Sequence, residues 1–196
     1  FNGVIFHDDA TMSDYEDASL DALKAYKKAG LPVELASIRA DEKKLQKWTA
    51  LKTQTIDDFS MELAQEIRYY QPFLMTARNM YAQVALSAYA ENWYAQSLER
   101  SLDHYDFTAI MAMPYMEQVE DKDQFFKDLV NRVSKYPNGL KKTVFEIQAV
   151  DWRNNNKVSS EEMAETFKSL YQQGALHVGY YPDNPFDNHP NPQILK

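Results

Sequence analysis

The stretch TVFEIQAV, at residues 143–150, decides the fold class of this chain. It is short and rich in β-branched and aromatic residues, as buried strands are. Side chains alternate along a strand, so Phe145, Ile147 and Ala149 share one face, while Glu146 and Gln148 share the other. If the apolar face meets helices, Glu146 and Gln148 point into the mouth of a barrel. A buried, unpaired carboxylate is costly, so Glu146 needs either a partner or a function.

Four other segments resemble this strand, and helical patterns separate them. The other strands are predicted at GVIFHD (3–8), FLMTARN (73–79), DFTAIMAM (106–113) and ALHVGYY (175–181). Helices are predicted from Ser19 to about Ala29, from Asp41 onwards, and over 88–103, 122–135 and 159–173. The last four strands begin near 73, 107, 143 and 175, so the units are spaced by about 34 residues. Such alternation predicts a parallel sheet with helices outside it.

Two of the predicted helices carry apolar residues at helical spacing. In the helix over 88–103, Trp93 lies on such a pattern together with Leu98 and Leu102. The helix that begins at Asp41 is longer, and its apolar stripe is expected to face the core along its whole length. The members of that stripe are Leu45, Trp48, Leu51, Phe59, Leu63 and Ile67.

Both an open doubly wound sheet and a (β/α)8 barrel have parallel strands of this kind. No glycine-rich turn follows the first strand, as a dinucleotide-binding sheet would need. Every predicted strand instead ends in polar or aromatic residues, and in parallel barrels such ends build the active site. The sequence therefore predicts an α/β fold that consists of the C-terminal five βα units of a (β/α)8 TIM-like barrel. Because Phe1 lies within a strand pattern, we interpret residues 1–196 as one partial barrel domain whose earlier units belong to a longer protein.

The composition excludes several classes of partner and chemistry. The chain of 196 residues is 44% hydrophobic, enough for one domain with a buried core, and its net charge is −8. No basic run is present, so nucleic acid and anionic membrane surfaces are not expected partners. Cysteine is absent, which excludes disulfides and thiolate chemistry. No apolar run approaches the roughly 20 residues of a membrane span, so membrane insertion by this segment is not expected.

Carboxylates are concentrated after the first predicted strand, at Asp8, Asp9, Asp14, Glu16 and Asp17. Acids in such a place often only solvate a loop or cap a helix. FHDDA superficially resembles the TFDDG motif of metal-dependent polysaccharide deacetylases, but none of the four histidines forms the closely spaced pair that such a metal site needs. No metalloprotease, serine-hydrolase or P-loop motif occurs either. We therefore expect no metal and no cofactor, and carboxylates among aromatic residues remain, which is the equipment of glycoside hydrolysis.

The order of several motifs resembles the C-terminal domain of the PgaB/HmsF family. They are FHDDATMSDYEDAS, YKKAGLP, RNMYA, MAMPYME, KTVFEIQAVDW and GYYPD, and they span nearly the whole chain. The resemblance implies a barrel-like glycoside hydrolase that acts on partly deacetylated poly-β-1,6-N-acetyl-D-glucosamine in biofilm formation. It also implies a periplasmic, outer-membrane-associated protein, with the export porin as a partner. The family's N-terminal deacetylase domain has no counterpart in this sequence.

Carried over by motif, the resemblance places the acidic site at Asp8 and Asp9. It implies that Asp14 and Asp17, from SDYED, and the aromatic residues Trp93 and Trp152 line the groove. The strand ends predict further substrate-binding residues, namely Arg78, Tyr115, Gln148, Tyr180 and Tyr181.

Hydrolysis of a hexosamine linkage needs an acid for the leaving oxygen and a second group at the anomeric centre. Asp8 is the predicted general acid, so its surroundings are expected to raise its pKa. The second role falls either to Glu146, as the carboxylate across the mouth, or to Asp9, orienting the substrate's own acetamide. A non-catalytic module that binds the polymer and guides it for export is the alternative function, because an acidic, aromatic groove serves both.

Overall fold

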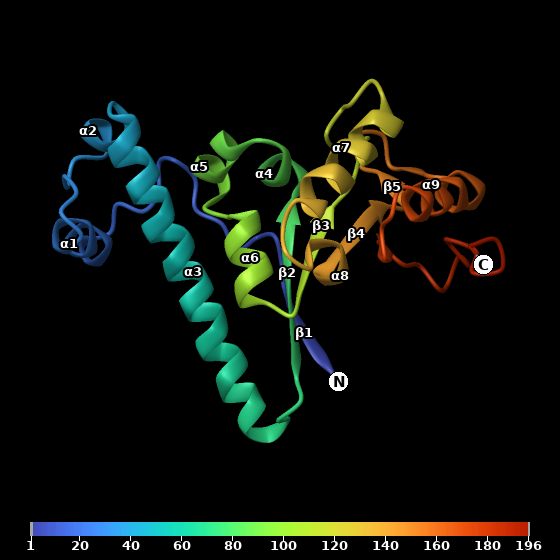
Figure 1. Ribbon diagram of the computed structural model, residues 1–196, viewed down its shortest axis with the longest axis horizontal. Helices are drawn as coiled ribbons and strands as arrows, with labels where there is room; N and C mark the ends of the chain where they lie inside the picture. The colour runs from blue at the N-terminus through green and yellow to red at the C-terminus, as the bar shows by residue number, and fades with distance from the viewer. Residues whose placement is uncertain (1, 196) are drawn as a thin grey trace.

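In the computed structural model, which describes residues 2–195, five parallel strands form one sheet in the order β1-β2-β3-β4-β7 (Figure 1). Their neighbours in the sheet follow their order in the chain, apart from a separate small hairpin, as consecutive βα units require. The prediction of a parallel sheet in chain order is confirmed. The strands are β1 Gly3–Phe6, β2 Met75–Tyr81, β3 Phe107–Met111, β4 Thr143–Gln148 and β7 His177–Tyr181, and the hairpin is β5 Val150–Asp151 with β6 Asn156–Lys157.

The main helices begin at the capping residues that the sequence predicts. The side chains of Ser19, Asp41 and Ser159 each accept a backbone N–H of the first turn, which satisfies one otherwise unpaired donor. Helical segments lie between the strands: α1 Leu20–Lys28, α2 Leu35–Arg39, α3 Glu42–Tyr70, α4 Ala82–Leu86, η1 Ala88–Ala90, α5 Glu91–Tyr94, α6 Leu98–His104, α7 Lys122–Ser134, α8 Gly139–Lys142 and α9 Ser160–Gln172.

The single helix predicted over 88–103 is wrong, because the segment is divided into η1, α5 and α6. Ala95 ends α5 in the left-handed region, at φ 47°, and Ser97 is extended. Gln96 between them turns inward, where its Oε1 accepts the backbone N–H of Tyr81 at 3.2 Å. This bond ties the loop between α5 and α6 to the end of β2.

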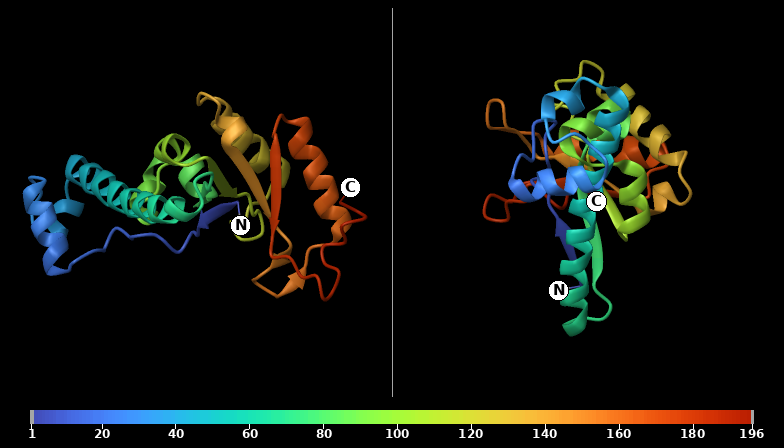
Figure 2. Two further views of the ribbon diagram at one scale, coloured as in Figure 1. Left: turned by 90° about the horizontal axis from the view of Figure 1, so that it is seen from below. Right: turned by 90° about the vertical axis from the view of Figure 1, so that its left-hand side faces the viewer.

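The main core lies between the sheet and the helices α4, α6, α7 and α9. Phe145 is fully buried in it, which confirms that its side of β4 faces the helix layer. A separate small core, made of Tyr26, Leu31, Ile38, Leu45 and Trp48, joins α1 and α2 to the N-terminal half of α3. Figure 1 and the left view of Figure 2 show this second unit at one end of the molecule and α9 at the other.

The prediction that the whole apolar stripe of α3 faces the core is wrong for its C-terminal half. Leu45 and Trp48 are buried, but Phe59, Leu63 and Ile67 are 60%, 42% and 40% exposed. In the described part of the chain, β1 pairs only with β2, so no further strand or helix covers this side of α3. The apolar stripe is therefore present in the sequence, but its C-terminal half stays exposed among residues 2–195.

Candidate active site

A cavity of about 300 Å³ opens at the carboxyl ends of the parallel strands. Strand direction explains its position, since parallel strands bring their C-terminal residues to one edge of the sheet. Apolar side chains, three of them methionines, make up much of its wall. Two carboxyl groups also line it, one from the turn after β1 and one from β4. The lining residues are Ile5, His7, Asp8, Asn79, Met111, Met113, Met116, Glu146, Trp152 and Tyr181.

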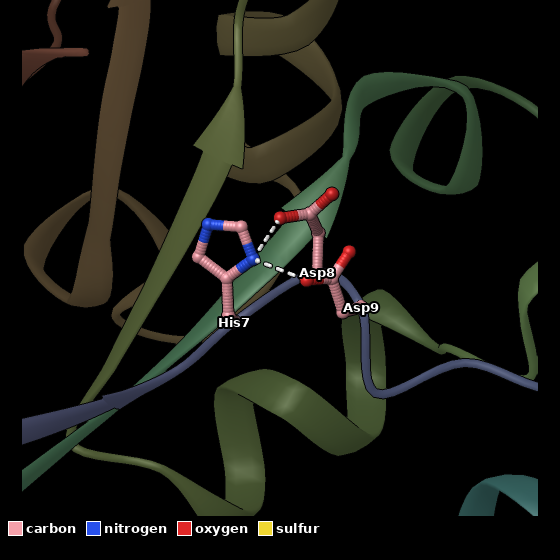
Figure 3. Close-up of side chains that lie close together, drawn as sticks. All are labelled: His7, Asp8 and Asp9. Atoms are coloured by element: carbon pink, nitrogen blue, oxygen red, sulfur yellow. Dashed lines mark ion pairs between the residues drawn. The ribbon is translucent and has the colours of Figure 1, made fainter. Parts of the chain in front are cut away.

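Asp8 lies on the turn that follows β1 and is only 8% exposed. Its Oδ1 is 2.6 Å from Nδ1 of His7, and Oδ2 of Asp9 is 3.5 Å from the same nitrogen (Figure 3). No well-aligned hydrogen bond reaches that oxygen of Asp8 in the described chain, so its contact with His7 is one of proximity. Asp9 itself is exposed, so of the two acids only Asp8 is enclosed by the cavity wall.

Glu146 reaches the cavity from β4, as the alternation of the strand predicts, and this orientation is confirmed. Its Oε2 accepts a hydrogen bond of 2.9 Å from Nδ2 of Asn79, on β2. Burial raises the pKa of Glu146, and the negative charge of Asp8 adds to this, while the bond from Asn79 and the charge of His7 act in the opposite direction. Burial thus favours the protonated form of this carboxyl.

Tyr81, at the end of β2, is a site residue that sequence reasoning missed. Burial raises the pKa of its phenol, and a hydrogen bond to Asp8 and the charge of Asp8 raise it further. Its ring stacks on Tyr94, with centroids 4.2 Å apart and planes 19° from parallel. RNMYA places Tyr81 two residues after Asn79 on the same strand face, and this alternation was the available signal.

Trp152 and Tyr181 form an aromatic wall of the cavity. They are 40% and 50% exposed, and their ring centroids lie 6.3 Å apart with planes 32° from parallel. Tyr181 also meets the edge of the His7 ring at 6.5 Å. Partly exposed rings beside carboxyl groups are suited to stacking on the apolar face of a sugar.

Four other predicted site residues lie near the strand ends without lining this cavity. Arg78 is buried and donates to backbone carbonyls of the turn that carries Asp8. Oε1 of Gln148 accepts the backbone N–H groups of Tyr115 and Met116, at 2.9 and 3.1 Å, so Gln148 fixes the loop after β3. The hydroxyl of Tyr115 donates to Glu162 at 2.6 Å. Tyr180 contributes to the border of the main core.

The remaining three predicted site residues do not line the cavity either. Asp14 accepts two hydrogen bonds from the guanidinium of Arg39, at 3.0 and 3.2 Å. Asp17 accepts the backbone N–H of Ser19 at 2.7 Å. Trp93 is 45% exposed and meets Tyr89 edge to face at 5.4 Å. The structure therefore brings Asp8, Glu146, Trp152 and Tyr181 together in one cavity, with Asp9 at its edge, and the other predicted contacts stay predictions.

His7, Asp8 and Asp9 each offer one atom that could bind a metal ion, and these atoms lie within 4.8 Å of one another. Two ligands of one metal ion at about 2.1 Å lie roughly 3 Å or more apart. Nδ1 of His7 and Oδ1 of Asp8 are closer, at 2.6 Å. This separation is shorter than two ligands of one metal ion allow, so the arrangement does not fit a metal centre.

Among residues 2–195, no helix has the length and apolar character that crossing a membrane requires.

Comparisons with known proteins agree with this architecture. The chain is 38% identical over 202 residues to the poly-beta-1,6-N-acetyl-D-glucosamine N-deacetylases of Escherichia coli K12 and O157:H7, and it spans about 30% of their length. It also matches the solved PgaB (BpsB) glycoside hydrolase domain of Bordetella bronchiseptica, with a TM-score of 0.95 and 42% identity, over 100% of this chain and 56% of that one. The predicted resemblance and the barrel-like α/β fold are confirmed.

A family model described as hypothetical glycosyl hydrolase family 13, GHL13, matches residues 1–181. These residues include all five strands of the sheet and every residue that lines the cavity. The chain belongs to this family.

Proposed function

We propose that this chain is part of a glycoside hydrolase domain that cleaves partly de-N-acetylated poly-β-1,6-N-acetyl-D-glucosamine within the polymer. The observation that carries the proposal is the meeting of Asp8 and Glu146 in one cavity, with Trp152 and Tyr181 on its wall. Two carboxyl groups across a sugar-sized space are what glycoside hydrolysis needs. The names of the relatives and of the solved domain support both the polymer and the reaction.

Two assignments of the catalytic roles fit the pair. In the first, which the sequence predicts, Asp8 protonates the leaving oxygen and Glu146, or the substrate's acetamide oriented by Asp9, acts at the anomeric centre. In the second, Glu146 is the acid, because burial raises its pKa, and Asp8, which lies beside His7 and Tyr81, acts at the anomeric centre. Where Asp8 and Glu146 act as the pair, removal of either carboxyl group stops the reaction. Where the acetamide oriented by Asp9 acts in place of Glu146, removal of Asp8 stops it.

The surface charge suits the proposed polymer. Deacetylated units carry ammonium groups, and a net charge of −8 attracts them over distances of about a Debye length, roughly 8–10 Å in physiological salt. The rings of Trp152 and Tyr181 give apolar faces for the neutral units between them. The periplasmic, outer-membrane-associated location and the export porin as a partner belong to the same proposal.

The exposed side of β1 and α3 supports the proposal that earlier barrel units precede this segment. Ile5, Phe59 and Leu63 are exposed on that side, and together with neighbouring residues they line a second cavity of about 610 Å³. Apolar surface of this kind is stabilised when another βα unit covers it. Experiments on catalysis are therefore designed for the full-length protein.

The test is product analysis after incubation of the full-length protein with partly deacetylated polymer. The parent protein should release short oligosaccharides. Asp8→Asn and Glu146→Gln should each lower the rate by about 10²-fold or more, because each removes a proton donor or an anion from the reaction. Asp128→Asn, which removes an exposed carboxylate from α7, is the matched control and should cleave at the parent rate.

The same experiment distinguishes the alternative function. If the parent binds the polymer and releases no products, the domain is a polysaccharide-binding module, and Asp8→Asn should then change only the affinity. If both single variants cleave at the parent rate, the acids of the reaction lie elsewhere and the proposed site is wrong.

A further inference from the structure

Arg78 lies under the turn that carries Asp8, with only 2% of its surface exposed. Its Nη1 donates to the carbonyl of His7 at 2.6 Å and, more weakly, to that of Phe6 at 3.4 Å. Its Nη2 donates to the carbonyl of Ala10 at 2.5 Å. One guanidinium therefore spans the turn from the residue before Asp8 to the residue after Asp9.

The guanidinium of Arg78 has no carboxylate within ion-pair distance among residues 2–195. Burial lowers the pKa of Arg78, while Tyr105, Asp57 and Asp8 attract its charge from farther away. A buried cation paired only with backbone carbonyls costs stability, so a purely structural role is a poor explanation for it.

The turn itself has few other restraints. Sheet pairing between β1 and β2 ends at Phe6 with Arg78, one residue before His7. Beyond that point the backbone bonds of the turn are those from Ala10 to His7, at 3.3 Å, and from Thr11 to Asp9, at 2.9 Å. The forked hydrogen bonds of Arg78 therefore hold the backbone of this turn to the sheet, in addition to the hydrogen bond between Tyr81 of β2 and the carboxyl group of Asp8.

We propose that Arg78 is a positioning residue, which holds the backbone of residues 7–10 so that the carboxyl group of Asp8 is fixed in the cavity. This inference rests on the proposed function, and it replaces the predicted contact between Arg78 and the substrate. Arg78 does not line the cavity, whereas Asp8 does. Arginine suits the task because its planar fork reaches two carbonyls at once, and lysine has a single nitrogen.

The first test measures the turn itself and does not depend on catalysis. Hydrogen exchange of the amides of residues 8–11 should become about tenfold faster or more in Arg78→Gln, since a hydrogen bond to a charged group is lost. Arg78→Lys should lie between Arg78→Gln and the parent. Arg132→Gln is the matched control, because it removes an arginine that donates to the carbonyl of Ala85 at 3.2 Å, away from this turn. Unchanged exchange in Arg78→Gln would overturn the inference.

The second test uses the polymer and the full-length protein. If Arg78 positions Asp8, Arg78→Gln should lower kcat by about 10²-fold with KM within a factor of about two, since small misplacements of a reacting group have this effect. Arg78→Lys should recover part of the loss, and Arg132→Gln should match the parent. A raised KM with unchanged kcat would show a substrate contact instead and overturn the inference.

The two tests separate the inference from the proposed function. Faster exchange in Arg78→Gln, together with a parent protein that does not cleave, would refute the hydrolase and leave the tie between Arg78 and the turn intact. Equal losses of kcat and of melting temperature in Arg78→Gln and Arg132→Gln would show general destabilisation, and the positioning role would be wrong.

Discussion

Asp8 and Glu146 reach the same cavity by different routes. Glu146 is part of β4, which is paired with β3 and β7 on both sides, and its neighbour Phe145 is buried in the main core. Asp8 lies on a turn beyond the last paired residue of β1, an edge strand in the described part of the chain. The sheet therefore fixes Glu146, and a side chain 71 residues away in sequence, Arg78, fixes the backbone beside Asp8.

This difference determines what sequence can reveal. Alternation along a strand depends on neighbouring residues alone, so the orientation of Glu146 is predictable from TVFEIQ. The place of Asp8 depends on hydrogen bonds between a turn and a distant arginine, which have no local pattern. We therefore expect Glu146 to move only when the core is disturbed, and Asp8 to move when one buried contact is lost.

The largest effect is expected when the packing that holds β4, and with it Glu146, is removed. Phe145→Ala should lower the free energy of unfolding by about 3–5 kcal/mol, because it leaves a cavity in the main core. Measured by urea unfolding, Leu176→Ala should change stability by no more than about 0.5 kcal/mol, since Leu176 is half exposed just before β7. A loss in Phe145→Ala as small as that of the control would mean that packing does not hold β4.

The sequence predicts most of the fold for the same local reason. The five strands, their parallel order and the capped starts of α1, α3 and α9 follow from short-range patterns, and the structure confirms them. The break at Ala95 was missed because the side chain of Gln96 bonds to the end of β2, a contact that helical spacing does not encode. The exposed half of α3 was missed because periodicity shows an apolar face without showing what covers it.

Some of the site residues can likewise be predicted from local patterns, and others cannot. The meeting of Asp8, Glu146, Trp152 and Tyr181 is predictable, since parallel strands bring their ends together. Arg78 and Gln148 look like ligand contacts in sequence, yet both bond to loop backbone, which their residue types alone cannot reveal. Tyr81 was overlooked because the predicted strand ends at Asn79, whereas β2 continues to Tyr81.

A smaller effect is expected from the charge of Glu146 on stability. Burial raises the folded-state pKa of Glu146 above its ordinary value of 4.5, so the folded protein binds more protons than the unfolded chain between these two values. The stability contributed by the protonated form is present below about pH 4.5 and is lost as the pH rises through the folded pKa. Ionisation of this buried carboxyl therefore costs stability, and Glu146→Gln should raise the melting temperature at pH 7.

The pH dependence provides the control for this expectation. At pH 4 both parent and Glu146→Gln carry a neutral side chain at this position, so their melting temperatures should nearly coincide. Glu146→Gln keeps an oxygen that can accept the bond from Asn79. Calorimetry at the two pH values would contradict the expectation if the variant melted lower than the parent at both, because Glu146 would then stabilise the fold as an anion.

The smallest expected effect concerns the hydrogen bond from Asn79, which lowers the pKa of Glu146 and so opposes the effect of burial. Nδ2 of Asn79 donates to Glu146 and lowers its pKa, so Asn79→Ala should move that pKa further upward. The limb of the pH profile of kcat/KM that belongs to Glu146 should shift to higher pH, whereas Asn131→Ala, an exposed change on α7, should leave it in place. Carboxyl NMR titration of Glu146 gives the same pKa without catalysis. A downward shift in Asn79→Ala would mean that water or another donor replaces the lost bond, and that the sheet fixes the position of Glu146 without setting its charge.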